Sequence, residues 1–335
     1  MEILSGFKVA KYKFILEAGP EGLELPPYKG STFRGGFGSA FRRIVCSQKT
    51  GQCRGCLLRS SCPYAYIFET APPAGSEALR NYESVPRPFV IEPPAETKTF
   101  FEPGESLEFS LVLVGKAITY LPYFIVVFRE LGAAGVGKGR RSYVLRNITA
   151  INPLDRTEKK VYEAENQKVI NTDLIVSGSD INNYCSRLNG RTVTVDYLTM
   201  TRLKYNNGFV NSPEFHVLIR NLLRRISSLM YFHHDMEMDI DFKGIIEKAC
   251  NVKIVSDRTR WVDWERYSNR QNARMKLGGI TGQAVYEGCL DVFWPLLKLG
   301  ELVHVGKATT FGMGKYEMAM RYISTRGGDL CQKLK

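Results

Sequence analysis

The chain repeats one order of predicted elements in its two halves. In the first half, residues 11–17 and 106–115 alternate in hydrophobicity as strands do, and 32–45 and 121–131 carry helical periodicity before a closing strand at 141–148. In the second half, predicted strands at 191–204, 278–286 and 315–322 accompany predicted helices at 212–229 and 291–299. A doubled βαββαβ plan explains this order, so we predict an α+β fold of two tandem ferredoxin-like domains with glycine-rich loops.

The last segments of the two halves share the same residue pattern. Leu131-Gly132 precedes a Gly-Val-Gly-Lys run ending at Lys138, and Leu299-Gly300 precedes a Gly-Met-Gly-Lys run ending at Lys315. Between the halves polar residues crowd and apolar periodicity fades. We therefore predict an N-terminal domain over 1–155 with an insertion at about 46–105, a linker over 156–188, a C-terminal domain over 189–324 and a tail over 325–335.

Basic residues are segregated along the chain. The formal net charge is +12, and residues 26–68 contain seven lysines and arginines but no acid. Residues 131–154 are also free of acids. Segregated positive charge indicates a binding surface for a polyanion, either nucleic acid or an anionic membrane surface. No run of about 18 apolar residues and no secretory pattern is found, so we expect a cytoplasmic protein that does not span a membrane.

Four cysteines form a cluster with the spacing C-x6-C-x2-C-x5-C: Cys46, Cys53, Cys56 and Cys62. In a reducing compartment such a cluster indicates thiolate ligands rather than disulfides. Zinc is the default ion for four thiolates, a [4Fe-4S] cluster takes the same ligands, and unliganded thiols are the third alternative. Since four protein ligands leave no open position, we expect a structural role for the metal.

The run from Gly300 to Tyr316, GELVHVGKATTFGMGKY, is similar to the C-terminal glycine-rich signature of the CRISPR-associated RAMP superfamily. It most resembles the branch of pre-crRNA-processing endoribonucleases that has a cysteine cluster in the N-terminal domain. Ala308 departs from the pattern, because a further glycine often stands there. Further segments fit the same resemblance: 32–38, 62–65, 86–90, 135–140, 224–225, 264–268, 270–271 and 277–282.

The resemblance implies cleavage of CRISPR repeat RNA, the precursor of crRNA, without a metal ion. The 2′-hydroxyl would attack the neighbouring phosphate and leave a 2′,3′-cyclic phosphate, which requires a base, an acid and cations for the phosphorane. Family members often place a histidine near the first helix, but this sequence has no histidine before residue 216. The catalytic candidates are His304, which could instead pack the glycine-rich loop, and Tyr28, Lys29 and Arg34.

Several basic or glycine-rich positions are candidates for RNA binding. His216, Arg220 and Arg224 share one helix face, and residues 258–276 mix arginines with Trp261 and Trp264, as single-stranded RNA sites do. A core role for these tryptophans is the alternative, and we expect His233 and His234 to serve the helix end structurally. The candidates are Arg42, Arg43, Lys138, Arg140, Arg141, His216, Arg220, Arg224, Arg266, Arg270, Arg274, Gly306, Lys307, Gly312, Gly314 and Lys315.

Three functional hypotheses follow. The first is a nuclease acting on single-stranded or hairpin repeat RNA. The second, favoured by the missing early histidine, is a non-catalytic RNA-binding subunit that joins other subunits of a CRISPR effector complex. The third is a metal-cluster protein of redox or DNA-binding type, which would require neither the doubled plan nor the C-terminal signature.

Overall fold

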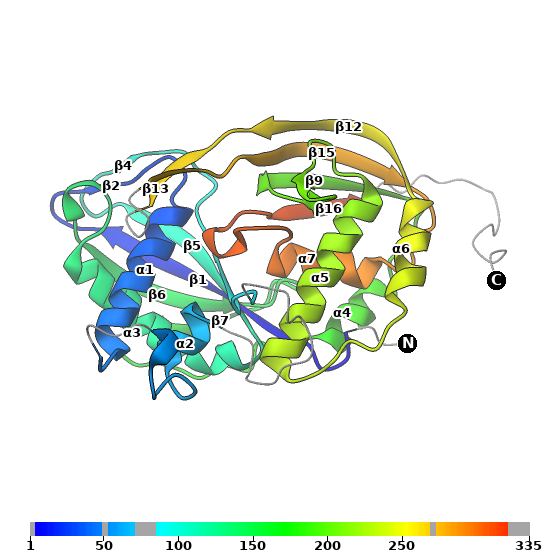
Figure 1. Cartoon of the computed structure of the whole chain (residues 1–335). Coiled ribbons are helices and arrows are strands. Elements are labelled where there is room, and N and C mark those ends of the chain that lie inside the picture. The colour runs from blue at the N-terminus through cyan, green and yellow to red at the C-terminus, as the bar shows by residue number, and fades with distance from the viewer. Residues whose placement is uncertain (1–3, 49–52, 71–84, 269–272, 321–335) are drawn as a thin grey trace.

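A computed structural model of the chain describes residues 4–48, 53–70, 85–268 and 273–320, and shows two sheets lying side by side with helices packed on them (Figure 1). The first sheet has the strand order β3-β5-β1-β6-β7, and the second has the order β12-β15-β9-β16. All pairs in both sheets are antiparallel. The strands are β1 Lys8–Ala18, β3 Phe89–Glu92, β5 Ser106–Val114, β6 Tyr143–Ile151, β7 Glu158–Glu163, β9 Thr192–Thr201, β12 Lys253–Val262, β15 Gly279–Glu287 and β16 Tyr316–Met320.

Both sheets have the same strand topology. If the four principal strands of each domain are numbered along the chain, each sheet places them in the order two, three, one, four. The predicted α+β fold of tandem ferredoxin-like domains is thereby confirmed. The second strand of each domain, β3 and β12, was missed. β3 has only four residues, all buried, and β12 is an edge strand with no buried residue, so neither gives the alternation of apolar and polar residues of a half-buried strand.

Helices α1 Gly30–Val45 and α3 Leu121–Ala134 cover one face of the first sheet. Phe37 of α1 stacks on Phe124 of α3, with ring centroids 4.5 Å apart, and lies 5.3 Å from Phe128. Alternate residues of β1, among them Phe14 and Leu16, complete this core. The short helix α2 Pro63–Phe68 lies beside α1, and its Phe68 packs 6.0 Å from Phe37.

The other face of the first sheet belongs to the core of the second domain. Val9, Val112 and Val114 of the first sheet join one buried cluster with Leu222 and Leu299, which lie on helices of the second domain. The helices of this domain are α4 Gly178–Cys185, α5 Phe215–His234, α6 Phe242–Cys250 and α7 Trp294–Val303. The two domains are therefore joined by a continuous apolar core.

The range 156–188, predicted as a linker, contains folded elements that bind both domains. β7 extends the first sheet, and the short strand β8 Val176–Ser177 pairs with β1. Ser177 then caps α4 by a reciprocal capping box with Asp180, and α4 packs against α7. Its polar composition hid this structure, because β7 and α4 each bury only a few residues.

Short elements complete the fold. The segment Gly115–Ala134, made of the 3-10 helix η2 Gly115–Tyr120 and α3, is long and apolar enough to cross a membrane by length and composition alone. Its inner face is used by the first core, where Phe124, Val127 and Phe128 are fully buried, as in a core helix of a folded domain. The remaining elements are β2 Leu23–Glu24, β4 Phe100–Phe101, β10 Lys204–Tyr205, β11 Gly208–Phe209, β13 Glu265–Ser268, β14 Ala273–Lys276, η1 Cys53–Gly55, η3 Lys138–Arg140 and η4 Thr309–Phe311.

Candidate nucleic-acid interface

The C-terminal glycine-rich loop lies between α7 and β16 and folds back on itself. Gly306, Gly312 and Gly314 all have positive φ, and a Cβ atom at Gly314 would collide with the carbonyl oxygen of Val305. Ala308, at the position where a glycine was expected, also has a positive φ of 63°. The sharp turns of this loop are the reason for its glycines.

The amide groups of this loop face inward. Val305 N donates to Gly314 O at 3.0 Å, Lys307 N donates to Arg202 O at 3.2 Å, and Gly314 N donates to Met200 O at 3.2 Å. Gly312 N also donates, to Thr309 O at 2.9 Å, so the expectation that the glycines present unobstructed amides to phosphate oxygens is wrong for Gly312 and Gly314. The hydrogen bonds to Arg202 and Met200 hold the loop against the end of β9 instead.

The same loop touches the N-terminal domain. The Tyr28 hydroxyl donates to the carbonyl oxygen of Phe311 at 2.9 Å, and the backbone of Gly30 lies so close to that carbonyl that no side chain would fit. The Arg34 guanidinium lies 5.0 Å from the Phe311 ring centroid and 4.1 Å from that of Phe68. The predicted catalytic residues at the start of α1 and the glycine-rich loop are thus brought together.

Their polar atoms, however, are engaged within the protein. Lys29 is fully buried, its Nζ donates to the carbonyl oxygens of Glu96 at 2.9 Å and Pro27 at 3.3 Å, and burial lowers its pKa. Burial and the nearby Glu92 carboxylate raise the pKa of Tyr28. Tyr28 therefore fixes the contact between the domains, Lys29 is held within the N-terminal domain, and neither offers a solvent-facing proton donor or acceptor in this conformation.

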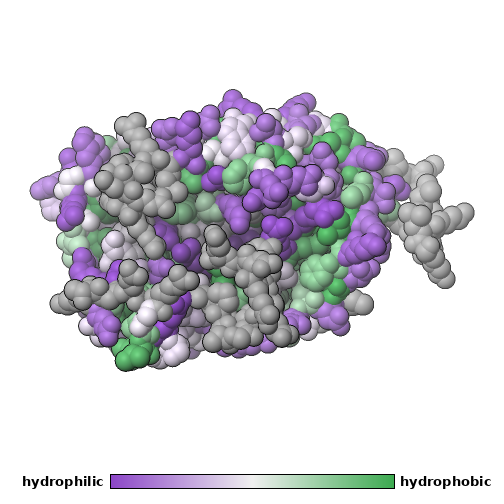
Figure 2. Space-filling model, in the orientation of Figure 1, coloured by the Kyte–Doolittle hydropathy of each residue, from purple (hydrophilic) through white to green (hydrophobic). Residues whose placement is uncertain are grey.

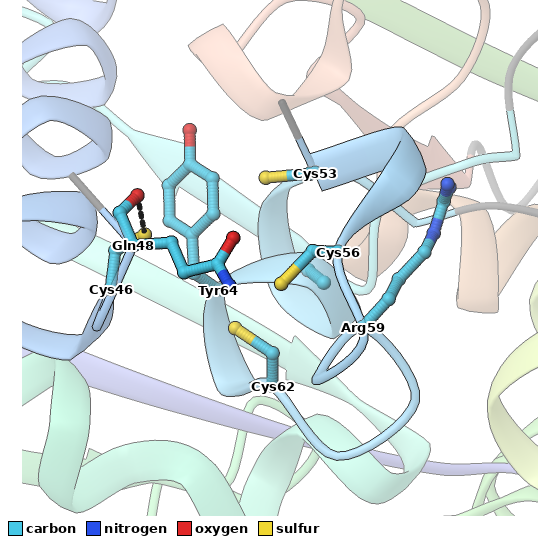
Figure 3. A pocket seen from close by; sticks show the side chains of 8 residues that line it. Cys46, Gln48, Cys53, Cys56, Arg59, Cys62 and Tyr64 are labelled. Atoms are coloured by element: carbon cyan, nitrogen blue, oxygen red, sulfur yellow. Dashed lines mark hydrogen bonds between the residues drawn. The ribbon is translucent and has the colours of Figure 1, made fainter. Parts of the chain in front are cut away.

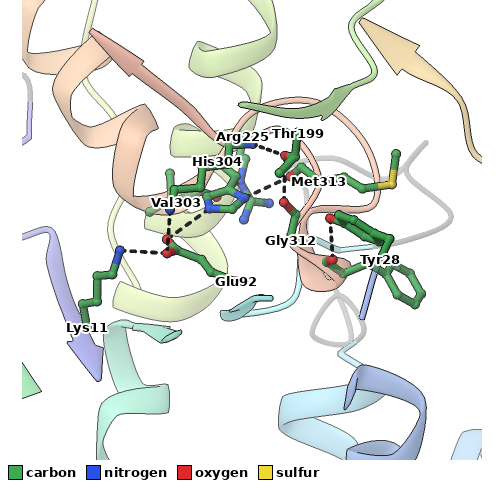
Figure 4. Close-up of polar contacts among 11 residues, drawn as sticks. Lys11, Tyr28, Glu92, Thr199, Arg225, Val303, His304, Gly312 and Met313 are labelled. Atoms are coloured by element: carbon green, nitrogen blue, oxygen red, sulfur yellow. Dashed lines mark hydrogen bonds and ion pairs between the residues drawn. The ribbon is translucent and has the colours of Figure 1, made fainter. Parts of the chain in front are cut away.

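His304 is also fully enclosed (Figure 4). Its Nδ1 lies 3.0 Å from the carbonyl oxygen of Met313, and its Nε2 lies 3.2 Å from Oε1 of Glu92. Its relative exposure is 0%, so the ring cannot touch RNA in this conformation. Contrary to the expected catalytic role, the structure places His304 as a positioning residue that fastens the loop to β3 of the other domain.

Glu92 is the centre of this contact, and sequence reasoning missed it. Lys11 Nζ lies 2.8 Å and Lys315 Nζ 3.3 Å from its Oε2. Burial alone would raise the pKa of Glu92, but Lys11, His304 and Lys315 together hold it well below its usual range. The sequence signal for a buried carboxylate was a single acid at the end of the apolar run PFVIE. Lys315, predicted to bind RNA, is committed to this cluster.

Arg225 supports the same junction from α5. Its side chain is buried, its Nε donates to the carbonyl oxygen of Val303 at 2.7 Å, and burial lowers its pKa to about 9 (Figure 4). Because the carbonyl it binds directly precedes His304, Arg225 fixes the start of the loop. Nothing in the sequence separates this arginine from its exposed neighbour Arg224.

A basic surface lies beside the loop, over β10 and the N-terminal half of α5, and consists of Arg202, Lys204, Tyr205, His216, Arg220, Arg224 and Lys307. Figure 2 shows hydrophilic residues gathered over this half of α5. Partial burial lowers the pKa of Lys307, and the nearby charges of Arg224 and Lys204 lower it further. These cations therefore lie close enough to repel one another. His216, Arg220, Arg224 and Lys307 were predicted for this role, whereas Arg202 and Lys204 were missed.

Aromatic rings are interleaved with these charges. The Arg202 guanidinium lies 4.2 Å from the ring centroid of Phe209, and that of Arg220 lies 5.7 Å from the ring of Tyr205. The Tyr205 and His216 rings meet edge to face at 5.2 Å. Within the described ranges, no ion pair reaches Arg202, Lys204, Arg220 or Lys307. Cations beside exposed rings form the arrangement that single-stranded nucleic acid requires.

The other predicted RNA-binding residues are dispersed. Lys138 and Arg141 pair with Glu24 at 2.9 Å and 3.8 Å, while Arg140 is exposed in η3. The C-terminal turn of α1 carries Arg42 and Arg43. The β13–β14 hairpin carries Arg266 and Arg274, whereas Arg270 lies outside the described residues. Trp264 packs edge to face on Tyr28 at 4.8 Å, which favours a packing role for this tryptophan.

The histidines that end α5 have the structural role that was predicted, but His233 does not act as a positive charge at the C-terminal end of the helix dipole. His233 is buried between the two domains, and burial lowers its pKa to about 4. Its Nε2–H donates to the carbonyl oxygen of Pro86 at 2.8 Å, and its Nδ1 accepts the Tyr66 hydroxyl at 3.2 Å. These partners suit a neutral ring. The expected positive charge at this helix end is therefore absent from His233 near neutral pH.

The cysteine cluster forms a separate pocket in the N-terminal domain. Cys46, Cys53, Cys56 and Cys62 line it together with Gln48, Arg59, Tyr64 and Ala65, and the sulfur atoms face a shared space (Figure 3). In the part of the chain that the structure describes, no group of three or more His, Cys, Asp or Glu side chains is already gathered as ion ligands.

Two family models match the chain. Residues 7–174 match a model described as an N-terminal domain, and residues 195–316 match that of the CRISPR-associated endoribonuclease Cas6. An uncharacterized protein of Archaeoglobus fulgidus is 27% identical over 296 residues, which are 88% of this chain and 92% of that protein.

Solved structures share the fold. A product complex of Cas6 (TTHB231) matches with a TM-score of 0.55 at 16% identity, over 92% of this chain and 99% of that one. Thermus thermophilus Cas6 (TTHB231) matches with a TM-score of 0.52 at 14% identity, over 94% and 100%. A partial Cas6-RT-Cas1–Cas2 complex gives 0.58 at 14% identity, over 99% of this chain and 49% of that one.

Proposed function

Because residues 195–316 match the Cas6 model and the chain shares the fold of solved Cas6 structures, we propose that it is a Cas6-type protein that binds CRISPR repeat RNA and cleaves it as a metal-independent endoribonuclease. The observation that carries the binding proposal is the basic surface, in which cations lie beside cations and beside aromatic rings. An RNA backbone lying across it would relieve the repulsion among Lys204, Arg224 and Lys307 and release its own counterions.

Side chains, rather than loop amides, would hold the RNA. The Nε atoms of Arg202 and Arg220 are buried and, among the described residues, have no hydrogen-bond partner. An unsatisfied guanidinium donor is costly in a folded protein, so a phosphate oxygen is a favourable addition. The rings of Tyr205 and Phe209 would offer stacking faces to unpaired bases.

Cleavage needs an acid–base group near the bound phosphate. His304 and His233 are fully buried, and His234 is held between the backbones of Lys8 and Leu229. His216 is the histidine whose ring is partly exposed on the basic surface, with Nε2 2.9 Å from a Glu214 oxygen. We assign it the proton transfer for attack of the 2′-hydroxyl, with Arg220 and Lys307 stabilising the phosphorane.

The test uses labelled CRISPR repeat RNA in EDTA, with a matched repeat in which the 2′-hydroxyls are replaced by hydrogen. We expect a discrete fragment ending in a 2′,3′-cyclic phosphate from the first substrate and none from the second. His216→Ala should abolish cleavage and weaken binding by no more than the loss of one contact on the basic surface. Full activity of His216→Ala would overturn its role, and cleavage that requires a divalent ion would overturn the metal-independent reaction.

Binding is tested separately by the salt dependence of the dissociation constant. Lys307→Ala should weaken binding and reduce the log–log salt slope by about 1, as expected for the loss of one phosphate contact. Lys243→Ala is the matched control, since this exposed lysine lies on α6 and pairs with Glu247. An unchanged slope for Lys307→Ala would contradict the assigned surface.

A second candidate function is that of a non-catalytic RNA-binding subunit. The observation that favours it is the engagement of Tyr28 and His304 in contacts between the domains and of Lys29 in contacts within the N-terminal domain. Tight, repeat-specific binding by the wild-type protein with both substrates intact after prolonged incubation would select this function over the nuclease. Equal affinity for repeat and unrelated RNA would reject both.

A further inference from the structure

The four clustered cysteines come from three backbone segments that meet at one place. Cys46 immediately follows α1, Cys53 begins η1 and Cys56 follows it, and Cys62 immediately precedes α2. The amide of Cys56 donates to the carbonyl oxygen of Cys53 at 3.4 Å, which closes the tight turn between these two cysteines. All four side chains line the same pocket (Figure 3).

The pocket has the chemistry of a thiolate metal site. All four cysteines are half-buried and none is in a disulfide, so each sulfur is available as a ligand. A tight turn between two cysteines lets both sulfurs reach one ion, and the remaining two complete a tetrahedral set. Arg59 also lines the pocket, and the charge of Arg42 acts on Cys53 together with that of Glu69, so two cations and one acid lie near the net negative charge of four thiolates around a divalent ion.

From this geometry we propose that Cys46, Cys53, Cys56 and Cys62 bind one zinc ion. Binding would rotate the side chains until each sulfur lies about 2.3 Å from the ion. The Cys46 thiol now donates to the carbonyl oxygen of Gln48 at 3.1 Å, and it would exchange this hydrogen bond for the metal and release a proton.

The ion would fasten the end of α1 to the beginning of α2. Tyr64, two residues after the last cysteine, packs 5.8 Å from Phe41 of α1, and Phe68 lies beneath the Arg34 guanidinium. Zinc would therefore keep α2 in place under the residues that meet the glycine-rich loop. With four protein ligands it has no open position, so its role is structural and independent of RNA cleavage.

The experiment is elemental analysis of the full chain purified without oxygen or added metal. We expect about one zinc per chain in the wild type and none in Cys53→Ser/Cys56→Ser. The control is Cys250→Ser/Cys289→Ser, which should retain the zinc because these two cysteines are exposed and distant from the cluster in sequence. Cobalt added to chelator-treated wild-type protein should give the visible bands of a tetrahedral thiolate site, which provides a readout if the cluster variant does not fold.

Each outcome has a defined meaning. Zinc in the wild type and the control but not in the cluster variant, with cobalt bands, supports the site. Iron with acid-labile sulfide in place of zinc overturns the choice of ion. Zinc retained by the cluster variant, or wild-type protein that binds neither zinc nor cobalt, overturns the site itself.

Discussion

Replacement of His233 should remove a large part of the pH dependence of folding. The folded pKa of His233 is about 4, against 6.5 as the ordinary value, because the ring is buried between the domains. Between these values the unfolded chain binds the proton and the folded chain does not, so folding stability falls as pH decreases. A difference of about 2.5 pH units corresponds to about 3 kcal/mol of unfolding free energy, fully present above pH 6.5 and lost by pH 4.

The assay is urea unfolding followed by circular dichroism at intervals between pH 7.5 and pH 4, for wild type and His233→Gln. Glutamine does not titrate, so the variant should lose about 3 kcal/mol less than wild type over this interval. Tyr66→Phe is the matched control, because it removes the hydroxyl that donates to Nδ1 but leaves the ring buried. It should lower stability at pH 7 by about 1 kcal/mol and keep most of the pH dependence. Equal pH dependence in wild type and His233→Gln would refute the reasoning.

Two further substitutions test the junction and the loop. Glu92→Gln removes the buried charge that compensates Lys11 and Lys315, and should cost about 3–5 kcal/mol in urea unfolding. Glu108→Gln, exposed on the neighbouring β5, should change stability by less than about 0.5 kcal/mol, and equal effects would contradict the role of Glu92. Gly314→Ala should lower the melting temperature because its Cβ atom would collide with the Val305 carbonyl. Gly35→Ala, in open space on α1, is the control and should leave the melting temperature unchanged or raise it. A melting temperature lowered by Gly35→Ala but not by Gly314→Ala would exclude the collision.

The sequence predicts the fold better than the site, and the physical reason lies in how each is encoded. The fold follows from apolar periodicity, as in α5, where Leu218, Leu222 and Ile226 recur on one face and are fully buried. The glycine-rich loop was located correctly, but the direction of its amides depends on the contact with Met200 and Arg202 from a distant strand.

The histidines show the same limit. His304 and His216 differ little in local sequence, yet one is enclosed at the domain junction and the other lies on the basic surface. Burial between domains is decided by tertiary packing, which no local pattern records. Glu92 was missed for this reason too, since its partners Lys11, His304 and Lys315 come from both halves of the chain.

The continuous core has a consequence for synthesis on the ribosome. The N-terminal half emerges first, and it can build its sheet and cover one face with α1 and α3. The opposite face, with Val9, Val112 and Val114, stays bare until the second half of the chain has been made, because its covering residues lie on α5 and α7. The nascent protein therefore exposes an aggregation-prone apolar surface for much of its translation, and α5 and α7 bury this surface only after they have been synthesised.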